Sequence, residues 1–346
     1  MLRGVQHREL EREFRVPVYD RYMIVVQIFR EHAISKEAKL QVALAEIPYL
    51  RMKIRGVSEG MVDQDEGAIE AVGGSGETSI DIRRKILNAR EIKLKKILEK
   101  LKAQRSLIRS NQKKLEYPVV AVIGYTNAGK TSLIKTLTGE KSLVPKNYLF
   151  ATLDVTAHAS LLPCNLKVLY VDTVGFISDI PTHLIAPFMA TLEDAMNANV
   201  IIHICDVSHP DILAQVDTVN KSLQSLNLSP DLLKNVLVVG NKVDLISDEM
   251  RENVKDCNIL VSAVTKEGIK ELVKKIEECI LEATGRVSIT IRVPADGEQM
   301  RWLYKGAAVT QVIADPQSSQ HFLLSVVITK SQLSKFKHTF IQNKKH

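Results

Sequence analysis

The sequence predicts an α/β protein built around a doubly wound sheet, with a helical arm before the sheet and a small α+β domain after it. Two observations support this fold class. Between residues 117 and 285, short apolar runs alternate with segments of helix length, and the preceding segment carries a long apolar heptad repeat. Alternating strands and helices are typical of a parallel sheet that binds its ligand at the carboxyl ends of the strands. The expected strands are residues 119–123, 168–171, 200–205, 236–239 and 259–261.

The first 34 residues are predicted to form a partial α/β unit, because residues 23–29 are apolar and partly β-branched, as in a buried strand. A helix is expected from Ser35, which can cap it, since apolar residues follow at three- and four-residue spacing. Pro48 conflicts with a straight helix and is expected to kink it. Residues 56–77 are polar and contain several glycines, which predicts a loop.

A long basic helix is predicted over residues 79–114, and it completes a helical arm that spans residues 35–116. An apolar residue recurs at every seventh position of this helix, which predicts a coiled-coil seam. The preceding helix is expected to fold back as the antiparallel partner, with the loop at the tip. The seam residues are Ile80, Leu87, Leu94, Leu101 and Ile108, and Ile97 and Leu98 widen the same apolar stripe. The basic residues expected to face outward are Arg83, Arg84, Lys93, Lys95, Lys96, Lys100 and Arg105.

Positive charge is concentrated outside the predicted sheet. Residues 79–116 contain 13 basic and 4 acidic side chains, and residues 286–346 contain 9 and 3, in a chain of net charge +7. A core with basic flanks suits binding to a polyanion such as RNA, and the loop at the tip of the arm would then reach into an RNA surface. The alternatives are a solvated helix face and an ordinary hairpin loop.

Length and composition set further limits. The 346 residues suffice for two or three domains, and the sequence contains no apolar run of about 18 residues that would predict a membrane span. The four cysteines lie far apart without zinc spacing, which favours a reducing compartment over a metal site. Glu9, Glu11 and Glu13 argue against an acid-poor transit peptide. We expect a monomer.

Residues 286–346 are predicted to form the small α+β domain. Apolar residues alternate with polar ones from Val287 to Val293, and a second strand fits residues 322–328. Leu333, Phe336 and Phe340 suit one face of a helix. Trp302 is expected to lie in the core of this domain. The alternative, a surface position on which an RNA base would stack, is less favoured.

A phosphate-binding loop is predicted directly after the first strand of the sheet, where the sequence matches G-x-x-x-x-G-K-T. In such a loop, backbone N–H groups surround the phosphates of a nucleotide, the lysine reaches the β- and γ-phosphates, and the hydroxyl binds Mg²⁺. The helix that begins at Ser132 adds the positive end of its dipole. A plain glycine-rich turn is the alternative, but it would not require the lysine. The expected nucleotide-binding residues are Gly124, Tyr125, Thr126, Asn127, Ala128, Gly129, Lys130, Thr131 and Ser132.

Residues for the γ-phosphate and Mg²⁺ are predicted further along the chain. Asp172 follows a strand and can hold Mg²⁺ through water, and the N–H group of Gly175 can meet the γ-phosphate. Thr152 lies between the phosphate-binding loop and Asp172, where a second hydroxyl ligand belongs. The predicted metal ligands are therefore Thr131, Thr152 and Asp172, and the predicted catalytic residues are Lys130, Thr152 and Gly175.

The motif Asn241-Lys242-Val243-Asp244 predicts which base is bound. The Asp244 carboxylate can accept hydrogen bonds from N1–H and the 2-amino group of guanine, which adenine cannot supply, so the expected ligand is GTP and not ATP. Asn241 is expected to support the purine edge. Ser262 and Ala263, after the last strand, are expected to close over the guanine oxygen. Residues 117–285 are therefore predicted to be a phosphate-binding-loop GTPase domain.

Phe176 stands where many GTPases carry the glutamine that orients the attacking water. A phenyl ring cannot do this, so we expect slow hydrolysis that depends on a partner or an ion. Asn127 suggests K⁺ as the ion, because some GTPases with an asparagine at this place in the loop use it to help hold K⁺ near the transferring phosphate.

These motifs resemble the HflX branch of ribosome-associated GTPases, and especially its animal mitochondrial members. The resemblance extends over residues 18–281, and a hydrophobic residue at Phe176 is normal for that branch. It departs from the bacterial pattern after Asp154, where this chain has Val155-Thr156-Ala157-His158 in place of proline, threonine and arginine. The segments that carry it are residues 19–21 (YDR), 37–42 (EAKLQV), 74–78 (GSGET), 83–84 (RR), 124–131 (GYTNAGKT), 149–154 (LFATLD), 172–176 (DTVGF) and 190–194 (ATLED).

The resemblance implies a Mg²⁺-dependent GTPase that binds the large ribosomal subunit and its rRNA, with the arm entering near the peptidyl-transferase centre. It further implies a role in ribosome dissociation and recycling or in late subunit assembly, and a mitochondrial location, with the cytoplasm as the alternative. Two other functions remain open from the sequence. One is an RNA-modification GTPase, and the other is a nucleotide-gated RNA-binding scaffold with little turnover.

Overall fold

The structure is a computed structural model, and it describes residues 2–62, 79–114, 117–145, 152, 156–177, 198–225, 228–253, 257–318 and 320–342. The chain divides into two compact units. The first contains residues 1–115, 149–154 and 178–192, and the second contains the remainder. Each unit is described by itself.

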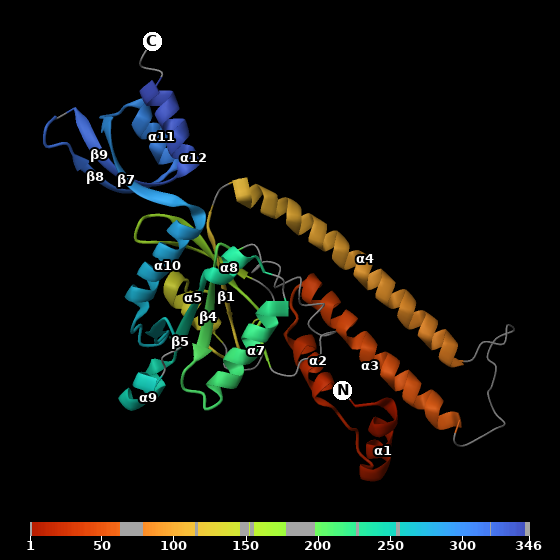
Figure 1. Cartoon of the computed structure of the whole chain (residues 1–346). Helices are drawn as coiled ribbons and strands as arrows, with labels where there is room; N and C mark the ends of the chain where they lie inside the picture. The colour runs from red at the N-terminus through yellow and green to blue at the C-terminus, as the bar shows by residue number, and fades with distance from the viewer. Residues whose placement is uncertain are drawn as a thin grey trace. The chain divides into compact units, whose positions relative to one another are not determined.

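The first unit is helical in the part that the structure describes (Figure 1). Helix α2 replaces the strand expected at residues 23–29. Asp20 caps α2 by accepting a hydrogen bond of 2.9 Å from the Met23 N–H group. The apolar residues of the segment then form one buried helical stripe of Tyr22, Val25, Val26 and Phe29. The helices of this unit are α1 (Gly4–Phe14), α2 (Arg21–His32), α3 (Lys36–Val62) and α4 (Ser79–Lys114).

Helices α3 and α4 form the predicted arm and run side by side (Figure 1). The Ser35 hydroxyl accepts a hydrogen bond of 3.0 Å from the Ala38 N–H group, which confirms the predicted cap. Helix α3 contains Pro48 and continues to Val62, so the prediction of a loop from residue 56 was wrong for its first seven residues. The remainder of that loop lies outside the described residues. An ion pair of 2.6 Å between Arg51 and Glu91 joins the two helices.

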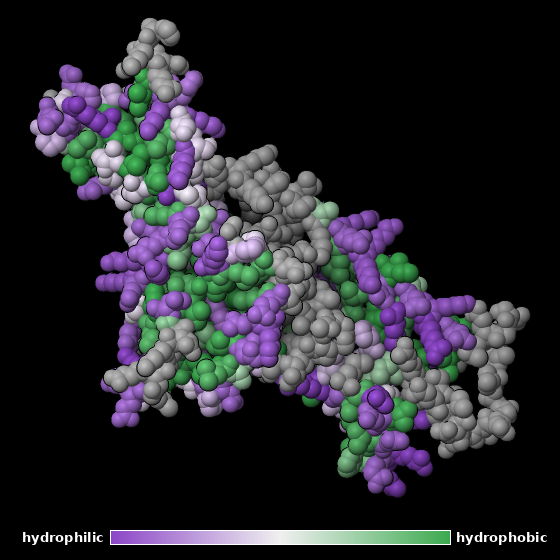
Figure 2. All heavy atoms as spheres, viewed as in Figure 1, coloured by the Kyte–Doolittle hydropathy of each residue, from purple (hydrophilic) through white to green (hydrophobic). Residues whose placement is uncertain are grey.

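Helix α4 buries part of the predicted seam and exposes its basic residues. Leu87 and Leu98 are buried, while Ile86 and Ile92 are exposed. Figure 2 shows hydrophilic residues with a few hydrophobic ones on the described part of this helix. The exposed basic residues include Arg83, Arg84, Lys93, Lys95, Lys96 and Lys100, whereas the side chain of Arg105 lies outside the described ones.

The second unit contains the predicted doubly wound sheet, with strands in the order β2-β3-β1-β4-β5-β6. The five predicted strands are present and parallel to their neighbours, and β2 is an additional antiparallel strand at the edge. The strands are β1 (Val119–Gly124), β2 (Thr156–Leu161), β3 (Lys167–Asp172), β4 (Val200–Asp206), β5 (Val236–Asn241) and β6 (Ile259–Val261). The helices of this region are α5 (Lys130–Thr138), α7 (Ile212–Ser225), α8 (Pro230–Lys234), η1 (Val243–Leu245), α9 (Asp248–Asn253) and α10 (Ile269–Thr284).

Helices cover both faces of this sheet. On β4, Ile202 and Ile204 join the core cluster that includes residues of α5 and α10. The alternate residues His203 and Cys205 lie near Ile212, Gln215 and Val216 of α7. This alternation follows from the two-residue period of a strand. It leaves the carboxyl ends of β1, β3, β4 and β5 as a common edge for the nucleotide-binding motifs.

The C-terminal part of the second unit is the expected α+β domain, with a three-stranded antiparallel sheet in the order β7-β9-β8. The predicted strands and the last helix are present, whereas α11 and β8 were not predicted. Trp302 packs against Phe336 and Phe340, with ring centroids 5.5 and 6.4 Å away, in agreement with a core position. The elements are β7 (Arg286–Pro294), α11 (Glu298–Gly306), β8 (Ala308–Ala314), β9 (His321–Thr329), α12 (Lys330–Lys337) and η2 (His338–Gln342).

Candidate nucleotide-binding site

The phosphate-binding loop turns from β1 into α5 through two residues in left-handed backbone conformations. These are Asn127, with φ of 63°, and Gly129, with φ of 96°. A Cβ atom at Gly129 would collide with the Asn241 amide, so only glycine fits there. The first turn of α5 leaves backbone N–H groups without partners inside the helix, and these groups together with the helix dipole favour an anion. Thr131 and Ser132 belong to this turn and are half-buried.

Lys130 is folded over the beginning of the loop and is only 6% exposed. Its Nζ atom donates to the carbonyl oxygens of Tyr125, at 3.0 Å, and Gly124, at 3.3 Å. Burial lowers the pKa of Lys130 to about 8, although the nearby Asp172 carboxylate opposes this shift. A buried ammonium whose partners are mostly neutral carbonyls gains strongly from an arriving phosphate.

Thr131 and Asp172 meet at the place where Mg²⁺ is expected. The Thr131 hydroxyl donates a hydrogen bond of 2.6 Å to Asp172 Oδ2, and Asp172 is 1% exposed at the end of β3. A hydroxyl and a carboxylate are the hard oxygen donors that Mg²⁺ prefers, so these residues fit the ion. The Thr173 hydroxyl donates to the carbonyl of Val122 at 2.8 Å, which fixes this segment to β1.

Gly175 and Phe176 lie against the phosphate-binding loop. The Phe176 N–H group donates to Gly124 O at 3.0 Å, and Phe176 O accepts from the Thr126 N–H group at 2.7 Å. A Cβ atom at Gly175 would lie 2.9 Å from Lys130 Nζ and from two atoms of Thr126. Any side chain there would therefore displace the lysine or the loop, which explains the glycine.

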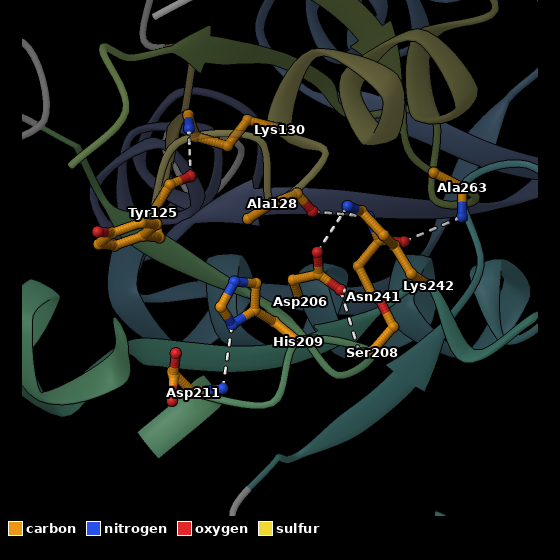
Figure 3. A network of polar contacts seen from close by, with 10 residues as sticks. All are labelled: Tyr125, Ala128, Lys130, Asp206, Ser208, His209, Asp211, Asn241, Lys242 and Ala263. Carbon is orange, nitrogen blue, oxygen red and sulfur yellow. Dashed lines mark hydrogen bonds and ion pairs between the residues drawn. The ribbon is translucent and has the colours of Figure 1, made fainter. Parts of the chain in front are cut away.

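The Asn241 side chain joins the phosphate-binding loop to the loop after β6 (Figure 3). Asn241 is 2% exposed. Its Nδ2 atom donates to Ala128 O at 2.9 Å, and its Oδ1 atom accepts from the Ala263 N–H group at 3.1 Å. The structure thus gives Asn241 a bridging role that the sequence did not reveal, and the predicted contact with the purine stays a prediction.

The other residues predicted to bind the base lie after β6 and in η1. Ser262 is buried and its Oγ atom accepts hydrogen bonds from the N–H groups of Val264 and Thr265, so it shapes the loop that presents Ala263. Asp244 lies in η1 and is exposed. Its predicted contact with guanine stays a prediction.

Two residues near the site were missing from the sequence analysis. Asp206, at the end of β4, forms an ion pair of 2.6 Å with Lys242. His203 is 2% exposed on β4, and its pKa is lowered to about 4 by burial and by the charge of Lys130. Asp206 could have been found from the sequence, because it is an acidic residue at the carboxyl end of a predicted parallel strand. No comparable signal existed for His203, because its position depends on the packing of α7.

Thr152 belongs to the other compact unit of the chain. Its predicted role as a ligand of Mg²⁺ therefore stays a prediction. The structure brings together Lys130, Thr131, Asp172 and Gly175 at the phosphate end of the site, and Asn241, Lys242 and Ala263 beside them.

Comparison with known proteins agrees with these motifs. The model of the GTP-binding GTPase middle region matches residues 32–112, and that of the 50S ribosome-binding GTPase matches residues 119–242. GTP-binding protein 6 of Xenopus laevis is 43% identical over 339 residues, covering 98% of this chain and 64% of that protein. A chloroplastic GTP-binding protein of Arabidopsis thaliana is 36% identical over 277 residues, covering 73% and 44%.

One of the relatives is a bacterial GTPase. The GTPase HflX of Magnetococcus marinus is 34% identical over 337 residues, which cover 96% of this chain and 76% of that protein. This chain spans 64% of the length of the animal relatives that it matches. With its phosphate-binding loop, Asp172 and Asn241 arranged as described, the chain belongs to the HflX family of GTPases.

Proposed function

We propose that this chain binds GTP with Mg²⁺, hydrolyses it, and acts on the large ribosomal subunit. The observation that carries the proposal is the set of contacts around one loop. Lys130 is buried over the loop, Thr131 lies 2.6 Å from Asp172, and Asn241 binds the loop from the base side. This arrangement supplies a cation for the β- and γ-phosphates and oxygen ligands for Mg²⁺.

Guanine selection is assigned to Asp244, with Ser262 and Ala263 at the guanine oxygen. The Asp244 carboxylate is exposed in η1, two residues after the bridging Asn241. An adenine ring placed there would offer no N1–H or 2-amino donor, so the carboxylate would lose its water without gaining a partner. That loss discriminates strongly between the two purines.

Ribosome binding is supported by the arm and by the family. A matching family model is described as a 50S ribosome-binding GTPase. Helix α4 exposes several basic side chains, and basic side chains on a long helix supply a sequence-independent attraction to rRNA phosphates. The proposed tasks are ribosome dissociation and recycling, and late assembly of the large subunit.

The proposed location is the mitochondrion, with the cytoplasm as the alternative. Relatives include animal GTP-binding protein 6 and a chloroplastic protein, which supports an organelle. In the described parts of the chain, no helix is both long enough and apolar enough to cross a membrane. We propose that the chain acts as a monomer.

Phe176 favours a second candidate function, a nucleotide-gated RNA-binding scaffold with little turnover. Its backbone binds the phosphate-binding loop through Gly124 and Thr126, and its side chain has no group to orient water. Slow hydrolysis by the isolated chain fits both functions. Stimulation by the ribosome is the property that separates them.

The test measures co-sedimentation with large subunits in GTP and in GDP, and GTP turnover with and without those subunits. Stronger binding in GTP together with stimulated turnover supports the enzyme. Binding in GTP without stimulation supports the scaffold, and binding that ignores the nucleotide contradicts both. Protection of rRNA at the peptidyl-transferase centre would show where the arm binds.

A charge-reversal variant tests the arm itself. Changing Lys93, Lys96 and Lys100 to Glu should weaken subunit binding and reduce its salt dependence, because these exposed residues lie on α4. GDP affinity should not change. The matched control reverses three exposed lysines of the GTPase domain, Lys266, Lys270 and Lys274. Equal losses in both variants would show a general charge effect and contradict a specific role for the arm.

A further inference from the structure

Asp206 lies outside the motifs that define the proposed nucleotide site, yet its carboxylate is held in one orientation. It is 9% exposed at the end of β4. Its Oδ1 atom accepts hydrogen bonds from the N–H group of Ser208 at 3.1 Å and from the Ser208 hydroxyl at 2.6 Å. An aspartate that accepts from the backbone two residues on closes a local turn, so this carboxylate cannot rotate freely.

The other oxygen of Asp206 binds the lysine of the guanine motif (Figure 3). Lys242 Nζ lies 2.6 Å from Asp206 Oδ2, and the two side chains are only 25% and 11% exposed. The sheet register pairs Asp206 with Asn241, which places Lys242 beside it. Lys242 itself has a left-handed backbone with φ of 71°, an uncommon conformation for a residue other than glycine.

The position of this lysine matters because Asp244 lies two residues further on. An ammonium on a flexible four-carbon stem can bind any carboxylate within its reach. If Lys242 bound Asp244, it would occupy an oxygen that guanine needs. A second cation near η1 is also paired elsewhere: Arg251 binds Glu267 at 2.8 Å while donating to Val243 O at 3.1 Å.

We propose that Asp206 is a positioning residue for guanine recognition. It holds the Lys242 ammonium away from Asp244 and leaves both Asp244 oxygens for the N1–H and 2-amino groups of the base. The inference rests on the proposed binding of guanine nucleotides. It adds the residue that keeps the base-reading carboxylate available, and it predicts an effect on base specificity as well as on affinity.

The test measures dissociation constants for GDP and for inosine diphosphate, which lacks the 2-amino group. In Asp206→Asn, the affinity for GDP should fall about tenfold, because one hydrogen bond to a charged group is lost. The affinity for inosine diphosphate should fall by a smaller factor, so the ratio of the two affinities, which favours GDP, should decrease. In the double variant Asp206→Asn/Lys242→Met, the competing ammonium is gone and the preference for GDP should return.

Asp211→Asn changes an exposed acid on the same loop and should leave both constants unchanged. An equal loss for the two nucleotides in Asp206→Asn, without recovery in the double variant, would overturn the inference and leave Asp206 a structural residue. A wild-type chain that binds GDP and ADP equally well would instead contradict the proposed function.

A milder variant covers the case in which Asp206→Asn does not fold, as judged by thermal melting. Ser208→Ala removes the 2.6 Å hydroxyl contact but keeps the backbone one, so it loosens the same carboxylate. It should shift the preference for GDP in the same direction by a smaller factor. At saturating GTP, kcat should be unchanged while KM rises, because only uniform binding is lost. An unchanged preference in this folded variant would count against the proposal.

Discussion

The Thr131 hydroxyl lies 2.6 Å from the Asp172 carboxylate and donates a hydrogen bond to it, which joins the first turn of α5 to the end of β3. These residues are 41 positions apart in the chain. Their contact places two oxygen donors beside the buried Lys130. The proposed Mg²⁺ site therefore depends on both elements, and either residue can be tested alone.

Asp172→Asn should raise the Mg²⁺ concentration required for half-maximal GTP turnover by about 10- to 100-fold, as expected when a group that orients a metal ligand is changed. Turnover measured across a Mg²⁺ titration checks this. Thr138→Ala is the control, because its hydroxyl donates to Ile134 O and accepts from the Glu140 N–H group, both at the other end of α5. An unchanged titration for Asp172→Asn would remove Asp172 from the proposed site.

Lys130 should make nucleotide binding depend on pH. Its pKa of about 8 means that, from about pH 8 to the ordinary value of 10.5, the folded chain without nucleotide binds fewer protons here than the unfolded chain. The stability linked to this group therefore rises with pH in that window. A phosphate requires the charged lysine, so GDP affinity should fall by about tenfold per pH unit above pH 8.

The variant Lys130→Arg separates this effect from titration of the nucleotide itself. A guanidinium stays charged throughout the range, so the variant should bind GDP more weakly at neutral pH but with a flatter pH profile. Titrations with a fluorescent nucleotide from about pH 7 to about pH 9.5 would measure both the affinity and its dependence on pH. Identical profiles for the two proteins would show that another group causes the dependence.

Asn241→Ala should destabilise the chain and weaken nucleotide binding together. It would leave the buried Ala128 O without its donor, at a cost of about 1–3 kcal/mol, and the part-buried Ala263 N–H group without its acceptor, at a smaller cost. Chemical denaturation with and without GDP measures both effects. Asn258→Ala is the matched control, because the Asn258 amide also accepts from a backbone N–H group, that of Val238, but is exposed. A similar loss in the two variants would mean that burial of the bridge has no special importance.

The dependence on K⁺ is tested through Asn127. GTP turnover should be faster in K⁺ than in Na⁺, and Asn127→Gly should remove the difference. Glycine is chosen because Asn127 has a φ of 63°, which glycine adopts without strain, so only the amide is lost. Equal rates in the two salts for the unchanged chain would refute the idea.

The elements that the sequence predicted correctly are those that carry their own signals. The parallel strands are nearly continuous apolar runs, and α4 follows its heptad repeat over the predicted residues. The phosphate-binding loop required left-handed residues at Asn127 and Gly129, which are types that accept this conformation. These features depend on neighbouring residues in the chain, so a pattern could reveal them.

Where local preference and packing disagreed, the prediction was wrong. The β-branched residues at 23–29 favoured a strand, but Asp20 caps a helix and Tyr22, Val25, Val26 and Phe29 share one buried face. Strand β2 was not predicted, because most of its residues are exposed and give no apolar pattern. It is an edge strand that pairs with β3.

The sequence by itself determined the chemical groups of this protein: a lysine and a hydroxyl after a glycine turn, acids at strand ends, and a basic helix. Only the tertiary structure decided which of them meet. Asn241 lies 113 residues from Ala128, and Lys242 lies 36 residues from Asp206, yet parallel pairing of the strands brings each pair into contact. Such contacts depend on sheet register and backbone direction, which are set by packing over the whole domain and leave no pattern between neighbouring residues.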